Sequence, residues 1–160
     1  MEVEKLMTRG VRTCGPNDTM NRAAQIMWEN DCGVVPVVDG EGKVVSMITD
    51  RDICMAAYLQ GKALAEMPVS LAASRRLVCV REHDAVEVAE ALMQEHQIRR
   101  VPVVDAQDRL VGVLSMGDLA RSFQVTDGGS VTHREVAKTL AAVCQPHHEP
   151  TTAPQARHAA

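Results

Sequence analysis

The hydrophobic pattern of the chain occurs twice at a fixed spacing. Pro36 and Pro102 each lie inside a run of valines, and Asp52 and Asp118 each follow a second apolar run. The two offsets are equal, because 102 − 36 and 118 − 52 both give 66. Internal similarity at a fixed spacing marks a repeated structural unit. With two copies, the pattern predicts a pseudo-symmetric pair of units rather than a solenoid.

Each copy contains two strands joined by a tight turn. The β-branched run 34–38 predicts a strand, and Asp39-Gly40 after it is typical of a hairpin because glycine tolerates positive φ. The apolar run 44–48 predicts the returning strand, which we expect to be covered on both faces. Residues 100–104 and 110–114 repeat this hairpin, with a less regular turn between them.

Each hairpin lies between two predicted helices. Apolar residues three to four positions apart predict a helix over 20–30, with an apolar face that includes Met27 and can extend to Trp28. Its counterpart in the second copy opens with Asp84 as N-cap and Glu87 as the capping-box partner. A brief strand before each of these helices completes the order strand, helix, strand, strand, helix.

Four shorter segments complete this outline. Residues 10–14 and 77–80 predict the brief opening strands. The helix after the first hairpin is expected to end near Gly61, and a last helix is predicted over 136–143.

The predicted domains follow from the repeat. Residues 1–66 form the first repeat with its lead-in, 67–126 form the second repeat, and 127–144 hold the C-terminal helix. The tail 145–160 contains three prolines and almost no large apolar side chain. Such a segment cannot bury enough surface to order itself, so we expect it to be flexible.

Composition narrows the class of protein. Hydrophobic residues make up 46% of the 160 residues and aromatic residues only 2%, so the core must consist of aliphatic side chains and methionine. A formal net charge of −4 argues against a nucleic-acid partner, which needs a basic face. No run approaches the roughly 18 apolar residues of a membrane span, and residues 1–5 do not resemble a signal peptide. We therefore expect a cytoplasmic protein.

The five cysteines form no C-x-x-C motif. Cys32, Cys54 and Cys79 lie in apolar patterns, and we expect them to be small buried hydrophobic residues. Cys14 and Cys144 lie near opposite ends of the chain. A disulfide between them would fasten the last helix to the first repeat, but the sequence does not reveal whether their geometry allows it.

Metal binding and catalysis are both disfavoured. Cys144, His133, His147 and His148 are ligand types that suit a soft metal, but most of them lie in or near the tail, where solvated side chains are the simpler interpretation. No motif holds a nucleophile next to a base, as covalent catalysis requires. We therefore expect neither a metal site nor an enzyme.

The repeated motifs resemble the two halves of a tandem CBS-domain pair, or Bateman module. They are Val-Val-Pro-Val-Val-Asp (34–39) with Arg-Val-Pro-Val-Val-Asp (100–105), and Ile-Thr-Asp-Arg-Asp-Ile (48–53) with Leu-Ser-Met-Gly-Asp-Leu (114–119). The resemblance covers about 7–124 and includes stand-alone bacterial CBS proteins of the hypoxic-response type. It implies an α+β fold of two βαββα repeats about a pseudo-two-fold axis. It also implies two clefts for AMP, ADP, ATP or S-adenosylmethionine, a homodimer, and regulation of a protein partner without catalysis.

The chemistry of the repeated motif suits a nucleoside ligand. Thr49 and Ser115 each supply a hydroxyl three residues before Asp52 and Asp118, at the start of a helix. A carboxylate can accept hydrogen bonds from both hydroxyls of a ribose, and such charge-assisted bonds are strong. A helix N-terminus favours phosphate, and Arg51 adds a planar donor for it.

The two sites are not expected to be equal. Gly117 takes the place of Arg51 in the second copy, although Arg99 and Arg100 beside the second hairpin can compensate. The first site is therefore the stronger candidate. The resemblance also implies that an adenine lies between apolar groups and backbone of the first strands of both hairpins, which include Val35, Pro36, Arg100, Val101 and Pro102.

Two simpler interpretations remain open. Thr49 with Asp52, and Ser115 with Asp118, are also variants of a capping box, which needs no ligand. Capping and binding can coexist, because a carboxylate has two oxygens. The alternative function is a CBS-like scaffold that dimerises or docks a partner without any ligand.

Overall fold

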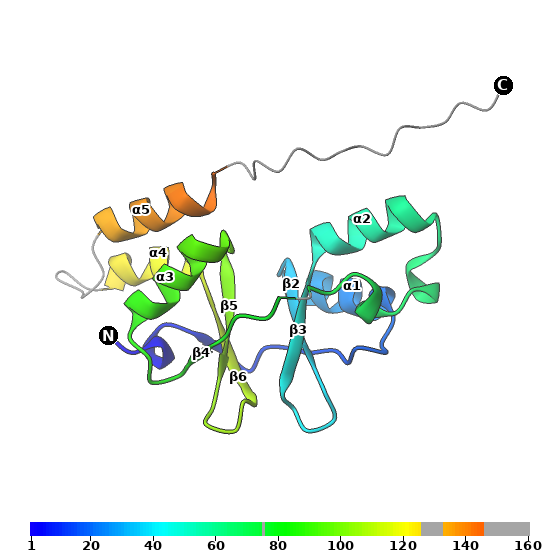
Figure 1. Ribbon diagram of the computed structural model, residues 1–160, viewed down its shortest axis with the longest axis horizontal. Coiled ribbons are helices and arrows are strands. Elements are labelled where there is room, and N and C mark those ends of the chain that lie inside the picture. The colour runs from blue at the N-terminus through cyan, green and yellow to red at the C-terminus, as the bar shows by residue number, and fades with distance from the viewer. Residues whose placement is uncertain (75, 126–132, 146–160) are drawn as a thin grey trace.

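The computed structural model describes residues 1–74, 76–125 and 133–145, and it forms two lobes that lie side by side (Figure 1). The helix, strand, strand, helix order predicted for each repeat is confirmed, as is the α+β fold with a C-terminal helix. The first lobe contains α1 (Met20–Glu29), β2 (Val34–Val38), β3 (Val44–Thr49) and α2 (Asp50–Gln60). The second contains β4 (Val80–Arg81), α3 (Val86–His96), β5 (Arg100–Val104), β6 (Leu110–Ser115) and α4 (Met116–Val125), followed by α5 (His133–Val143).

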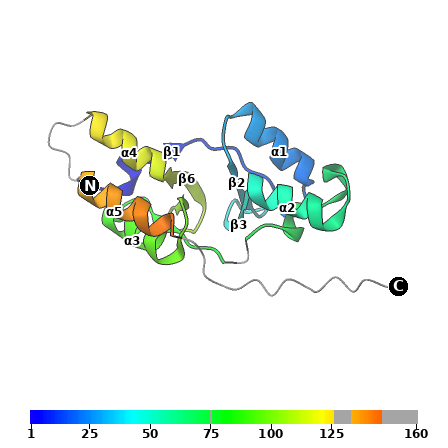
Figure 2. The same cartoon turned by 90° about the horizontal axis from the view of Figure 1, so that it is seen from above.

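The two hairpins face each other at the centre of the molecule, and the helices lie at its outer ends (Figures 1 and 2). The tips of the hairpins touch, because Lys43 and Arg109 form an isolated antiparallel bridge. These residues are equivalent, since 109 − 43 = 66. A contact between equivalent residues lies on the symmetry axis. The bridge therefore places the pseudo-two-fold axis between the two hairpin tips.

The segments that lead into the repeats are exchanged between the lobes. The N-terminal segment, with the short helix η1 (Val3–Lys5) and the strand β1 (Thr8–Arg9), pairs with β6 of the second lobe. Val3 is fully buried in the second core, whereas its equivalent Val69 is fully buried in the first. Each leading segment therefore packs across the predicted division at residues 66 and 67 and covers the core of the other lobe.

The sheet of the second lobe has the strand order β1-β6-β5-β4, and β2 pairs with β3 in the first lobe. Single backbone contacts complete the first sheet in the same way. Cys14 bridges to Val37 in parallel, and the Ser74 amide donates to the Met47 carbonyl at 2.9 Å. These contacts are the equivalents of the β4–β5 and β1–β6 pairings. The opening strands predicted over 10–14 and 77–80 are thus shorter and displaced.

Each lobe has its own core of aliphatic side chains and methionine. Met20, Ile48 and Met67 are fully buried in the first core, and Met93 and Leu114 in the second. This confirms the expectation of an aromatic-poor interior. The expectation that β3 is covered on both faces is wrong, because Val45 is exposed. Trp28 is also not part of the core, since 89% of it is exposed.

The ends of the helices are partly as predicted. The α2 helix ends at Gly61, which has the positive φ of 61° that favours glycine there. The capping box of Asp84 and Glu87 is wrong, because Ala85 is the N-cap of α3. The Asp84 carboxylate instead accepts from the Arg81 amide at 2.7 Å, which closes the turn before the helix.

The last helix, α5, packs on α3 and α4 (Figure 2). It begins at His133, three residues before the predicted start. Residues 146–160 of the predicted tail lie outside the described residues. Within the described part of the chain, no helix is both long and apolar enough to cross a membrane.

Candidate functional site

Both predicted hydroxyl–carboxylate pairs form capping boxes. At the start of α2, the Thr49 hydroxyl accepts from the Asp52 amide at 3.2 Å, and Asp52 Oδ2 accepts from the Thr49 amide at 2.9 Å and hydroxyl at 2.7 Å. At the start of α4, Ser115 and Asp118 make the same three contacts at 3.2, 2.8 and 2.6 Å. The structural role proposed from the sequence is therefore real. It uses one carboxylate oxygen of each aspartate.

The second oxygen of Asp52 remains open. Among the described residues, no hydrogen bond is assigned to its Oδ1, and the side chain is only half-buried. The oxygen lies in the first turn of α2, where amide groups point outward from the helix end. A carboxylate oxygen without a donor can accept a ligand hydroxyl. The neighbouring amides are already used, because the Asp50 amide donates to the Gly33 carbonyl at 3.3 Å and the Arg51 amide donates to Asp50 Oδ1 at 2.8 Å.

Asp52 borders a cavity of about 740 Å³ between the lobes, which we call the first cavity. Its walls come from β3 and the start of α2, from Ser74 and residues 76–78 between the lobes, and from residues 97–100 before and at the start of β5. Its charged lining consists of Arg51, Arg76, Arg99 and Arg100 with Asp50 and Asp52. The balance of four cations to two anions makes the first cavity basic.

Asp118 borders a smaller cavity of about 290 Å³, which we call the second cavity. Ser115 also lines it, with the N-terminal segment around β1 as the opposite wall. Arg9 and Arg12 contribute its cations, and Arg100 lines both cavities. The compensation expected from Arg99 is wrong, because Arg99 lines the first cavity only.

Each cavity combines groups from both repeats. Pro36 borders the second cavity, with Asp118, and Pro102 borders the first, with Asp52. This pairing of each proline with the aspartate of the other repeat follows from the facing hairpins, which present β2 to one cavity and β5 to the other. It was not evident from the sequence, in which each proline stands closest to the aspartate of its own repeat.

Val35 and Val101 line neither cavity. Both are fully buried in the hydrophobic cores. Side chains alternate between the faces of a strand, so that Val34 and Pro36 face the cavities while Val35 faces the core. The same alternation separates Val101 from its neighbours.

The C-terminal end of α5 forms one edge of the first cavity. Val143, Cys144 and Gln145 line it. Gln97 holds this end in place, because its Nε2 donates to the carbonyls of Ala142 at 3.4 Å and Gln145 at 3.3 Å. Sequence reasoning missed this wall, together with Arg9, Arg12 and Arg76. Arg76 is the equivalent of Gly10 in the N-terminal segment, since 76 − 10 = 66, and this offset is the sequence signal that could have identified it.

The cysteines differ from expectation. All five are free thiols, so the disulfide that the sequence left open between Cys14 and Cys144 is not formed. Cys14 is buried in the first core, where burial raises the pKa of its thiol to about 11, and Cys144 is exposed. Cys32 and Cys54 are exposed rather than buried. Cys79 is half-buried, and desolvation raises its pKa to about 11 as well.

One cluster of possible metal ligands occurs among the described residues. Ligand atoms of Glu2, Glu4 and His83 lie within 4.8 Å of one another. His83 Nδ1 lies 3.3 Å from a Glu2 oxygen, and this contact joins the N-terminus to the turn before α3. Of the histidines considered from the sequence, 147 and 148 lie outside the described residues, as does the side chain of His133.

Comparison with known proteins gives consistent results along the chain. A family model described as CBS domain matches residues 3–58 and 69–124. The chain is 42% identical over 118 residues to the CBS domain-containing protein YhcV of Bacillus subtilis, an alignment that covers 74% of this chain and 82% of that protein. It is 29% identical over 141 residues to Hypoxic response protein 1 of Mycobacterium tuberculosis, covering 88% and 92%.

Two similar solved structures contain adenosine compounds. The CBS domain pair of protein MJ0100, in complex with 5′-methylthioadenosine and S-adenosyl-L-methionine, has a TM-score of 0.70 and 27% identity and covers 78% of this chain and 97% of its own. CBSX2, in complex with AMP, has a TM-score of 0.67 and 25% identity, with the same coverage.

Proposed function

The chain belongs to the CBS-domain family, as its repeated motifs indicated, and we propose that it is a regulatory module that binds an adenosine-containing ligand between its repeats and has no catalytic activity of its own. The first cavity is the principal site in this proposal. Occupancy of the cavity is the signal, and a protein partner receives it.

The observation that carries the proposal is the open oxygen of Asp52. Its Oδ2 is used in the capping box, while Oδ1 has no assigned donor among the described residues, and Asp52 lines the first cavity. The two hydroxyls of a ribose are donors that suit such an oxygen. Pro102 and Ile98 on another wall of the cavity offer apolar surface for an adenine.

Charge favours a phosphate-bearing ligand. Four arginines and two aspartates line the first cavity, and guanidinium groups bind phosphate with paired donors. AMP, ADP and ATP carry phosphate, whereas S-adenosylmethionine carries a sulfonium cation and no phosphate. The similar structures hold both kinds of compound. The basic lining is therefore the reason to rank the nucleotides first for this chain.

A thermal-shift panel tests the proposal. The metal-free protein is heated with AMP, ADP, ATP, NAD and S-adenosylmethionine, and with GTP as a control for the adenine. A ligand present at a hundred times its Kd stabilises the folded state by about 2.7 kcal/mol. We expect an adenine nucleotide to raise the Tm and GTP to have a smaller effect. A flat panel with well-folded protein would contradict ligand binding.

We also propose that the protein is a homodimer that associates through α1 and α2. A groove between these helices is lined by Ala24, Met27, Trp28 and Ile53. In the second lobe the equivalents of Ala24 and Trp28 are Glu90 and Gln94, since 90 − 24 and 94 − 28 both give 66. There α5 covers the helices.

In the second lobe, hydrogen bonds join α3 to the helix α5 that covers it. The Gln94 amide donates to the Thr139 hydroxyl of α5 at 2.8 Å, and that hydroxyl donates to Glu90 at 3.5 Å. Among the described residues no helix of the same chain covers the groove of the first lobe, and its lining is mostly apolar with Asp31 and Asp50 as its charged members. An apolar surface that meets its own copy buries itself in a two-fold dimer, so a second copy of this chain is the occupant that we propose.

The exposed apolar face of α1 and α2 also favours the alternative function, which is a dimerising or partner-docking scaffold without a ligand. Met55, Tyr58 and Leu59 add further exposed hydrophobic side chains on α2, and patches of this kind mark interaction sites. A scaffold would form the dimer through them without binding any nucleotide. The thermal-shift panel separates the two functions, because only the sensor melts at a ligand-dependent temperature.

A further inference from the structure

The two equivalent aspartates differ in the state of their second oxygen. Asp118 Oδ1 accepts from the Thr8 hydroxyl at 3.3 Å and from the guanidinium of Arg121. Its side chain is 8% exposed as a result. Asp52 Oδ1 has no assigned donor among the described residues. The oxygen that the first cavity offers to a ligand is already occupied in the second.

The difference traces to residues at equivalent positions. Met55 takes the place of Arg121 in the first repeat, since 121 − 55 = 66, and a thioether cannot donate to a carboxylate. Ser74 is the equivalent of Thr8, but its hydroxyl donates to the Arg76 carbonyl at 2.9 Å. Neither of the two donors that close Asp118 therefore acts on Asp52.

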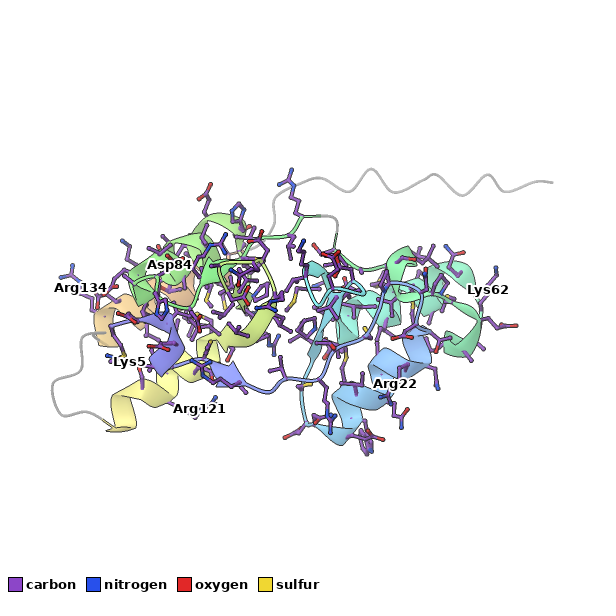
Figure 3. All side chains as sticks on the ribbon, turned by 90° about the horizontal axis from the view of Figure 1, so that it is seen from below. Lys5, Arg22, Lys62, Asp84, Arg121 and Arg134 are labelled. Atoms are coloured by element: carbon purple, nitrogen blue, oxygen red, sulfur yellow. The ribbon has the colours of Figure 1, made fainter. Side chains whose placement is uncertain are left out.

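A third substitution makes room for the guanidinium. A Cβ at Gly117 would lie 3.3 Å from an Nη atom of Arg121, so the arginine folds back across the first turn of α4. Figure 3 shows Arg121 on this helix close to the N-terminal segment that carries β1. The first repeat has Arg51 at this position, since 117 − 51 = 66, and Arg51 lines the first cavity.

We propose that Arg121 blocks the second site by holding the second oxygen of Asp118, so that the chain binds one nucleotide in the first cavity and none in the second. The inference rests on the proposed function, because it uses the same carboxylate chemistry. A ribose at Asp118 has to displace a charge-assisted hydrogen bond that is already formed, whereas a ribose at Asp52 does not. The smaller volume of the second cavity, about 290 Å³ against about 740 Å³, agrees with this difference.

Arg121 is accessible enough to be replaced without a large effect on folding. Its side chain is 67% exposed, although the Asp118 carboxylate that it contacts is buried and keeps the Thr8 hydroxyl as a donor. The capping box of Ser115 and Asp118 uses the other oxygen and stays intact when the arginine is removed. Arg121→Met copies the residue that the first repeat already has.

The test is calorimetric titration of the full chain with AMP. We expect one molar equivalent for the unaltered protein and two for Arg121→Met. The reciprocal variant, Met55→Arg combined with Arg51→Gly, copies the second repeat into the first. We expect it to bind at least tenfold more weakly than Arg51→Gly alone. Arg22→Met, an exposed arginine of α1 (Figure 3), is the matched control that keeps one equivalent.

The outcomes separate this inference from the proposed function. Two equivalents for the unaltered protein, or one equivalent for both the unaltered protein and Arg121→Met, would overturn the role of Arg121 and leave ligand binding in place. One equivalent for Arg121→Met with none for the unaltered protein would support the role of Arg121 and overturn the first cavity as the principal site. No binding by any of these proteins would overturn both proposals.

Discussion

At the scale of single residues, the pair of a hydroxyl and a carboxylate has two functions that do not compete. Asp52 Oδ2 closes the capping box, Oδ1 has no assigned donor among the described residues, and the residue lines the first cavity. Both functions were open from the sequence, because the spacing of Thr49 and Asp52 matches a capping box and the repeat marks the pair twice. The two are compatible because a carboxylate has two acceptor oxygens.

Gly112 offers a residue-scale test of how β1 is held. A Cβ there would lie 2.7 Å from the Thr8 carbonyl oxygen and 2.8 Å from Met7 Sδ, so the backbone of β1 must move to admit it. Overpacking of this kind costs about 1–3 kcal/mol. We expect Gly112→Ala to lower the free energy of unfolding by that amount, measured by urea denaturation.

The matched control is Gly40→Ala. Gly40 lies in the turn of the first hairpin, and nothing lies within 4 Å of a Cβ built there. We expect its unfolding free energy to stay within about 0.5 kcal/mol of the unaltered protein, as is usual for surface positions. Equal stability of the two variants would contradict the close approach of β1 to Gly112.

Much of the candidate site follows from sequence reasoning at this scale, and its limits have physical causes. Thr49, Asp52, Ser115 and Asp118 were identified because their chemistry repeats at a fixed offset. Arg121 was not identified, because a sequence does not reveal in which direction a long flexible side chain extends. The predicted burial of Cys54 was wrong because an apolar pattern does not fix which helix face is covered, and that of Cys32 was wrong because the residue lies in the loop between α1 and β2.

At the scale of elements, the exchange of leading segments joins the lobes. The N-terminal segment packs Val3 into the second core, and the linker between the repeats packs Val69 into the first. Helices and hairpins were predicted because their periodicity is local. The exchange of the leading segments was not predicted, because an apolar residue in a short segment can be buried against either of two similar cores.

The contact of α3 with α5 depends on pH through Glu90. Glu90 is buried beneath α5, and desolvation raises the pKa of its carboxyl, with further increases from Glu135 and then Glu87. The folded state therefore holds this proton more tightly than the unfolded state. Stability falls as the pH rises from the ordinary value of 4.5 through the raised pKa of the folded state.

We expect Glu90→Gln to remove this fall in stability with rising pH. At neutral pH the variant should be more stable than the unaltered protein by about 1–3 kcal/mol, the range for a buried polar group short of partners. Below the ordinary pKa of a glutamate the two proteins should have equal stability. Urea denaturation at both pH values measures this. A less stable variant at neutral pH would indicate that the ionised carboxylate supports α5.

At the scale of the whole molecule, the pseudo-symmetry is broken at two places. The second lobe carries α5 on its helices and an arginine on its aspartate, whereas the first lobe has an open groove and an open carboxylate. The first lobe is therefore the one that we expect to contact both a ligand and a second copy of the chain.

The groove on α1 and α2 gives a whole-molecule prediction. We expect Trp28→Glu to weaken the homodimer by about 2 kcal/mol or more, because a buried tryptophan is a typical energetic anchor of an interface. Sedimentation velocity over a range of concentrations measures the dissociation. Leu140→Glu is the control, since Leu140 is an exposed apolar residue of α5 rather than of the groove. Dissociation that is unchanged by Trp28→Glu would contradict an interface at α1 and α2.

The most direct test of ligand binding in the first cavity is the affinity of AMP for Asp52→Asn, measured by calorimetric titration. Asparagine keeps one acceptor oxygen for the capping box and removes the charge and the second acceptor. Asp84→Asn is the control, because Asp84 closes a turn and lines neither cavity. Loss of a charged hydrogen bond of about 1.5–3 kcal/mol predicts an affinity that is roughly ten- to a hundredfold weaker for Asp52→Asn and unchanged for Asp84→Asn. Equal affinities for all three proteins would contradict the account.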